Sequence, residues 1–115
     1  MSEDEHPYSL AYESNGIVYV SGAASIDYTT HQPVPGRREA LDAALAAVET
    51  RLAGVGLGID SIVKMTYFVT DLSLRSEAND QVVERFDPPR PARTVVQVAG
   101  IPYGGSAVIE VIAHR

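Results

Sequence analysis

The chain has 115 residues, a formal net charge of −6, 45% hydrophobic residues and no cysteine. This length fits one domain with one modest core, so we expect a single domain over residues 1–115. The absence of cysteine excludes disulfides, thiolate metal sites and a cysteine nucleophile, and favours a cytoplasmic location.

The charge pattern argues against nucleic acid and membrane partners. Phosphate binding needs clustered lysine and arginine, and Lys64 is the chain's single lysine. Residues 1–6 are acidic and polar, unlike a secretory signal, and we expect them to form a loose tail. No segment approaches the roughly 18 apolar residues that cross a bilayer.

The first predicted unit is a β-hairpin followed by a loop. Strands are expected at residues 9–13 and 17–23, joined by Asn15-Gly16, a dipeptide favoured in tight hairpin turns. Residues 27–36 contain two prolines and a glycine, which indicates a loop.

A helix is predicted over residues 37–53, because apolar side chains recur there at helical spacing. Its buried stripe comprises Leu41, Ala44, Leu45, Val48 and Leu52, and Gly54, Gly56 and Gly58 end it.

The second half of the chain predicts a strand, a helix and two strands. The strand covers residues 62–69, and Asp71 or Ser73 then caps the helix, which Pro88-Pro89 ends. The helix presents a stripe of Leu74, Ala78, Val82 and Phe86. The last strands are expected at residues 93–99 and 107–113.

The order β-β-α-β-α-β-β predicts an α+β sandwich of one mixed sheet with two helices on one face. The final strand is apolar on both sides, with Val108 and Ile112 on one face and Ile109 and Val111 on the other. We therefore infer that another copy of the chain covers the second face. The alternative is a twisted sheet whose apolar face stays partly exposed.

Two charged residues interrupt apolar strands and are candidates for chemistry. Glu110 lies mid-strand among apolar neighbours, where a buried carboxylate costs several kcal/mol unless it is paired or protonated. Arg93 begins another strand, and its guanidinium can bind a carboxylate with two hydrogen bonds. A structural ion pair is the competing interpretation for both. The three histidines have no metal-ligand spacing, so no metal site is expected.

Several segments together are similar to the RidA/YjgF family of reactive intermediate deaminases. They keep the family's order from Pro7 onward: Pro7-Tyr8-Ser9, Tyr19-Val20-Ser21-Gly22, Val63 to Leu72, Asn79, Arg90 to Ala99, and Val108 to Ala113. The Pro-Ala-Arg-Thr-Val-Val and Ile-Glu-Val-Ile-Ala segments are the most specific parts.

The resemblance implies a chorismate-mutase-like fold, a homotrimer and a site in each cleft between subunits. It implies that Arg93 holds the carboxylate of a 2-imino or enamine acid and that Glu110 handles water, giving a 2-keto acid and ammonia without a cofactor. Pocket-lining positions of the family are matched by Tyr8, Ser21, Gly22, Asn79 and Val95.

The chain departs from the family pattern at three positions. His6 replaces a glycine, Ala23 replaces a glutamine, and Val95 replaces a cysteine that many members carry, so only backbone groups can act there. Three alternatives stay open: a non-catalytic small-carboxylate sensor, a pathway-specific aminomuconate-type deaminase, and an endoribonuclease, which the acidic charge disfavours.

Overall fold

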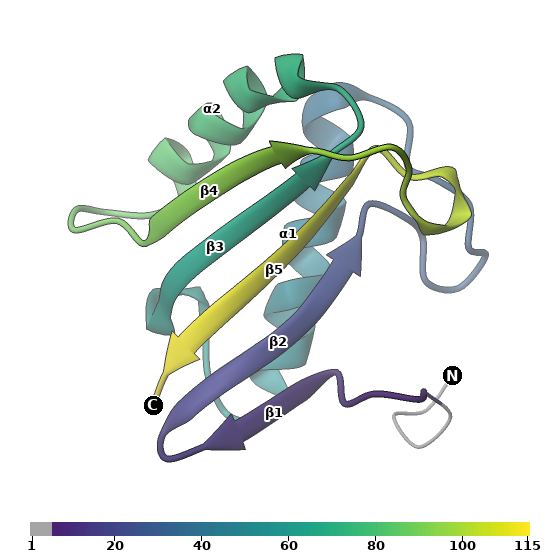
Figure 1. The fold of residues 1–115 in the computed structure, drawn as a ribbon. Coiled ribbons are helices and arrows are strands. Elements are labelled where there is room, and N and C mark those ends of the chain that lie inside the picture. The colour runs from purple at the N-terminus through teal and green to yellow at the C-terminus, as the bar shows by residue number, and fades with distance from the viewer. Residues whose placement is uncertain (1–5) are drawn as a thin grey trace.

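The computed structural model describes residues 6–115, which form one five-stranded sheet and two long helices (Figure 1). The elements are β1 (Ala11–Ser14), β2 (Ile17–Ala24), α1 (Arg37–Ala53), β3 (Ile62–Val69), α2 (Arg75–Arg85), β4 (Ala92–Gln97) and β5 (Ala107–His114). Most of the expected tail, residues 1–5, lies outside the described residues.

The sheet is mixed, as expected, with strand order β1-β2-β5-β3-β4. Neighbouring strands are antiparallel except for β3 and β4, which are parallel and connected through α2. The chain's last strand, β5, is therefore central, and β1 and β4 form the two edges.

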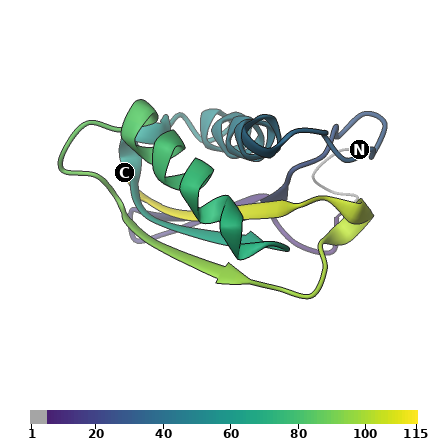
Figure 2. The same ribbon diagram turned by 90° about the horizontal axis from the view of Figure 1, so that it is seen from above.

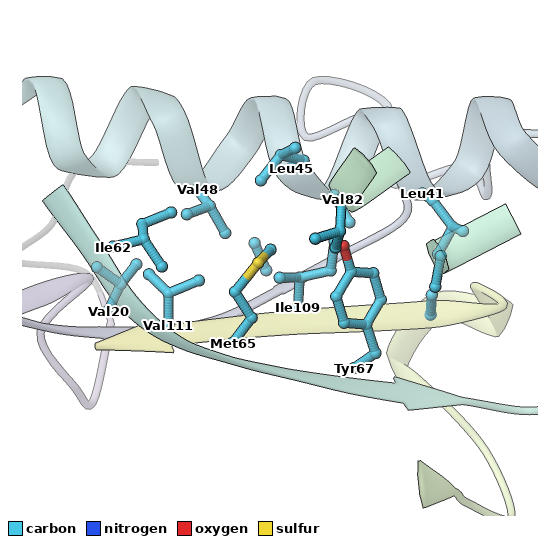
Figure 3. Close-up of a cluster of buried hydrophobic side chains, with 14 of the residues drawn as sticks. Val20, Leu41, Leu45, Val48, Ile62, Met65, Tyr67, Val82, Ile109 and Val111 are labelled. Carbon is cyan, nitrogen blue, oxygen red and sulfur yellow. The ribbon is translucent and has the colours of Figure 1, made fainter. Parts of the chain in front are cut away.

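Both helices cover the same face of the sheet (Figure 2). The predicted stripe of α1 is buried as a whole, with Ala40 added to it. In Figure 3, Leu41, Leu45 and Val48 of this stripe lie between the helix and the sheet, which carries Met65, Ile109 and Val111. The apolar spacing of residues 37–53 was thus sufficient to place this helix and its buried side.

Element ends differ from the predictions by a few residues. The turn at Asn15 and Gly16 has positive φ at both residues (53° and 79°), as a tight hairpin turn requires. However, β1 starts at Ala11 instead of residue 9, and β4 ends at Gln97 instead of residue 99. The end of a strand depends on where its hydrogen bonds to the neighbouring strand stop, and this position cannot be read from the residue types alone.

The start of α2 is preceded by a short 3₁₀ turn, Leu72–Leu74. Its cap is Asp71, whose side chain accepts a hydrogen bond from the backbone N–H of Ser73 at 2.9 Å. Asp71 thus caps the 3₁₀ turn, whereas the N-cap of α2 is Leu74, which makes no side-chain cap hydrogen bond, so the prediction that Asp71 or Ser73 caps this helix is wrong.

The face of the sheet opposite the helices has no cover from residues 6–115. Side chains of Tyr12 and Tyr19 on this face are 63% and 49% exposed, and Val96 is 38% exposed. The expectation of an uncovered, partly apolar face is confirmed for the single chain. Within the described part of the chain, no helix is long and apolar enough to cross a membrane.

Candidate functional site

A β-bulge in β2 forms the centre of the site. The register between β2 and β5 shifts between Val20 and Ala23, so that Ser21 and Gly22 together lie opposite Glu110. Such a bulge re-aims side chains and is common beside active sites. Three of the predicted site residues are thus brought together by strand pairing.

Position 22 requires glycine because there is no room for a side chain, and not because of its backbone conformation. A Cβ atom added to Gly22 would lie 2.6 Å from Val108 Cγ1 and 3.9 Å from Glu110 Cβ, and φ at Gly22 is outside the left-handed region. Because a contact of 2.6 Å is far inside van der Waals distance, a side chain here would push β2 away from β5.

Hydrogen bonds hold the bulge from both sides. The Ser21 hydroxyl donates to the Ser9 carbonyl at 2.7 Å, and the Ser21 N–H donates to the Leu10 carbonyl at 3.0 Å. From the helix side, Arg51 Nη1 donates to the carbonyls of Ser21 and Gly22 at 2.7 and 3.2 Å. These four hydrogen bonds within the chain therefore fix the bulge backbone.

A hollow of about 450 Å³ lies on the uncovered face beside the bulge. Tyr8, Ser21 and Glu110 line it, which places three residues that are far apart in the sequence around one space. The remaining lining residues are Ser9, Tyr12, Tyr19, Val20, Val111 and Ile112.

The expectation that Glu110 is buried among apolar groups is wrong for the single chain. Glu110 is exposed, while its neighbours Ile109 and Val111 are buried. Alternation along β5 sends these two side chains toward the helices and sends the carboxylate to the open face. Ala23 is fully buried in the core, so it does not line the hollow.

Arg93 forms a second group at the β4 edge of the sheet. Its guanidinium lies over the ring of Tyr67, with Cζ 5.7 Å from the ring centroid. Burial lowers the pKa of Arg93; Tyr67 acts against this lowering, and the nearby positive charge of Arg75 adds to it. Among residues 6–115 no carboxylate lies within ion-pair distance of Arg93, so this desolvated cation favours an anion.

A buried network supports the Tyr67 ring. The Tyr67 hydroxyl donates to Gln81 Oε1 at 2.5 Å, and Gln81 Nε2 donates to Asp42 Oδ1 at 2.9 Å. Burial raises the pKa of Tyr67, which keeps its phenol neutral. Burial also acts to raise the pKa of Asp42, but hydrogen bonds from Gln81 and Arg38 prevail and lower it.

Arg93 and Glu110 lie on opposite faces of the sheet and form no ion pair with each other. Arg93 is in register with Met65, and Glu110 is in register with the next residue, Thr66. Adjacent residues of one strand point to opposite faces, and two inter-strand spacings separate the two backbones by about 10 Å. One chain therefore does not bring its two candidate catalytic residues together.

Asn79 and Val95 belong to the Arg93 side of the molecule. Val95 is half-buried against the core, and Asn79 is exposed on α2, one helical turn after Arg75. The seven predicted residues thus divide into two groups. Tyr8, Ser21 and Glu110 line the hollow, with Gly22 beside them in the bulge, while Arg93 and Val95 lie on β4 and Asn79 lies on α2.

Sequence reasoning missed Tyr67 and Gln81, which support Arg93 from below. Gln81 is fully buried and stands beside the apolar stripe of α2. The sequence does contain a signal for this pair: a glutamine adjoins the buried stripe of the helix, and a tyrosine lies in an apolar strand. Because a buried amide needs hydrogen-bond partners, these two residues could have been predicted to pair. No cluster of three potential metal ligands occurs among the described residues.

Comparison with known proteins agrees with this fold. A family model described as Endoribonuclease L-PSP matches residues 2–115. A 2-iminobutanoate/2-iminopropanoate deaminase from Bos taurus is 35% identical over 108 residues, which cover 93% of this chain and 79% of the relative.

Two solved structures are similar over nearly the whole chain. RidA from an Antarctic Psychrobacter has a TM-score of 0.88 at 30% identity and covers 96% of this chain and 90% of its own. E. coli TdcF with bound serine has a TM-score of 0.81 at 27% identity, covering 96% and 89%. The chain therefore belongs to the RidA/YjgF family.

Proposed function

We propose that the protein hydrolyses 2-imino acids and their enamine tautomers to 2-keto acids and ammonia. The observation that carries this proposal is the partly buried Arg93, whose guanidinium lies over the Tyr67 ring and has no carboxylate partner among residues 6–115. A substrate carboxylate would supply the missing anion. Relatives named 2-iminobutanoate/2-iminopropanoate deaminase support the same chemistry.

Arg93 would anchor and orient the substrate. A guanidinium offers two parallel N–H donors to a carboxylate, and hydrogen bonds to charged groups contribute about 1.5–3 kcal/mol each. The Tyr67 ring, held by its own network, supports the guanidinium, so the imine carbon of the bound acid would lie in one defined position. The serine bound to E. coli TdcF, an amino acid with a carboxylate, supports binding of this ligand class.

Glu110 would act on water. Its carboxylate accepts a proton as the water oxygen bonds to the imine carbon, and the C=N π electrons move to nitrogen. Glu110 then returns that proton to the nitrogen, which gives a carbinolamine. The same carboxylate would next move the carbinolamine hydroxyl proton to the nitrogen, so that the C–N bond breaks with release of ammonia and formation of the keto group. Such general acid–base catalysis contributes about 10²–10⁴-fold, and the reaction needs no redox partner.

Arg93 and Glu110 would meet only between two copies of the chain. The uncovered face carries Glu110 and exposed tyrosines, and its burial against other copies would remove an apolar patch from water. A closed ring of three copies would bring the β4 edge of one subunit against the Glu110 hollow of the next. We therefore propose a homotrimer with shared sites, and Asn79 and Val95 join from the Arg93 side.

The test is imine hydrolysis by matched variants. An amino-acid oxidase generates 2-iminobutyrate, and the release of 2-ketobutyrate is followed. We expect Arg93→Ala to lose nearly all activity while remaining folded, and Glu110→Gln to turn over about 10²-fold more slowly while still binding 2-ketobutyrate. The control Arg85→Ala removes a surface arginine that pairs with Glu49 and should leave the rate unchanged.

The outcomes separate the alternatives. Full activity in Arg93→Ala contradicts the anchor, and loss of binding together with rate in Glu110→Gln indicates a structural role for that carboxylate. Binding of 2-ketobutyrate by the wild type without imine turnover indicates a sensor. The family description names an endoribonuclease, but a net charge of −6 opposes phosphate binding, so we expect no salt-sensitive RNA binding.

A further inference from the structure

A second cavity, of about 530 Å³, lies against α1 and away from Arg93, and we call it the α1 cavity. Ala47, Thr50 and Arg51 of α1 form one wall. The other lining residues come from three separate segments: His6, Pro7, Tyr8 and Leu10; Tyr28 and His31; and Tyr103. A cavity of this size suits a small organic molecule.

Arg51 gives this cavity a cation with unused donors. Only its Nη1 atom is engaged, toward the Ser21 and Gly22 carbonyls. Within residues 6–115, Nε and Nη2 have no hydrogen-bond partner, and no carboxylate lies at ion-pair distance from the side chain. Arg51 is partly buried, so its guanidinium is weakly hydrated. Its hydrogen bonds to the bulge hold it in place, and an anion could bind it with little loss of water.

The cavity also has aromatic surfaces. Arg51 Cζ lies 5.5 Å from the centroid of the Tyr28 ring, and the Tyr28 hydroxyl is fixed because it accepts a hydrogen bond from the Ala24 N–H at 2.7 Å. The rings of His31 and Tyr103 stack at 4.7 Å with 17° between their planes. Flat surfaces beside a cation fit a flat, unsaturated ligand.

The His31–Tyr103 pair is held by unusual backbone. Both residues have left-handed φ values, 61° and 62°, which non-glycine residues seldom adopt. Each lies in a different loop, so two strained positions project their rings toward each other at the same cavity. Backbone strain of this kind clusters at active sites, ligand clamps and switch regions.

We propose that the α1 cavity binds a carboxylic acid that carries a flat aromatic or conjugated group, with Arg51 as the anion anchor and the His31–Tyr103 pair as a stacking surface. This site is distinct from the proposed imine site, because neither Arg93 nor Glu110 lines it. Tyr8 alone of the predicted site residues borders both spaces.

The test is a titration with phenylacetate, followed through the backbone amides of Ala47 and Thr50 by NMR and by calorimetry. Phenylacetamide, its neutral analogue, is titrated in parallel. We expect phenylacetate to bind wild type and Arg93→Ala equally, and phenylacetamide to bind at least about tenfold more weakly, because hydrogen bonds to a charged group are lost. Arg51→Met should weaken phenylacetate binding to a similar degree.

A second variant keeps the test decisive if Arg51→Met misfolds. Tyr103→Asn retains a residue that tolerates the left-handed backbone but removes the stacked ring. It should weaken phenylacetate binding about three- to tenfold and leave imine turnover unchanged. The proposal is overturned if Tyr103→Asn binds phenylacetate as wild type does, if phenylacetamide binds equally well, or if Arg93→Ala abolishes binding.

Discussion

Gly22→Ala tests the geometry of the bulge with a single methyl group. The added carbon would lie 2.6 Å from Val108 Cγ1, whereas carbon–carbon contacts are normally about 3.5–4.0 Å. Valine has few favourable χ1 rotamers, so we expect the backbones to separate by about 1 Å to relieve the contact. Overpacking of this kind costs about 1–3 kcal/mol.

The expected result has two parts. At equal subunit concentration, a loss of about 2 kcal/mol divided by an m value of about 2 kcal/mol/M lowers the urea midpoint by about 1 M. Because Gly22 lies opposite Glu110, the same displacement should lower kcat/KM for imine hydrolysis by about 10²-fold.

Gly100→Ala is the matched control. A Cβ atom there meets nothing within 4 Å and the backbone φ is not left-handed, so stability and activity should match wild type. If Gly22→Ala were as stable and as active as Gly100→Ala, the close approach of β2 and β5 would have no role in the site and the reasoning would be refuted.

Two further predictions concern the support beneath Arg93. Tyr67→Phe should lower the free energy of unfolding by about 1–3 kcal/mol in urea titrations, because Gln81 Oε1 loses its buried donor, while KM stays unchanged since the ring remains. An unchanged urea midpoint would contradict this role. Asp42→Asn should destabilise the fold at pH 7, because the native pKa of Asp42 is lowered and the ionised form stabilises the folded state above the unfolded pKa. That difference should shrink as the pH falls below about 4, and a difference independent of pH would count against it.

Local patterns predicted most of the fold. The helical spacing in residues 37–53 identified both the helix and its buried stripe, because amphipathic periodicity depends only on neighbouring residues. The order of elements also indicated one sheet with a face left open. Strand order and the β2 bulge were not predictable, since both depend on which segments pair across long distances in the chain.

The sequence predicted which residues belong to the site but not how they are arranged in space. The sequence pattern selected Arg93 and Glu110 because charges interrupt apolar strands, but it placed Glu110 in a buried environment, whereas alternation along β5 exposes it. The buried pair of Tyr67 and Gln81 escaped notice because each residue is ordinary in its own segment. Their partnership exists only after α2 packs on β3.

The most direct test of the shared site is activity after mixing two inactive variants. Arg93→Ala and Glu110→Gln are unfolded together in equal amounts, refolded and assayed for 2-iminobutyrate hydrolysis. If each site takes Arg93 from one subunit and Glu110 from its neighbour, random assembly restores about one quarter of the wild-type activity. If the mixture is no more active than the separate variants, Arg93 and Glu110 do not act across subunits and the proposed shared site does not exist.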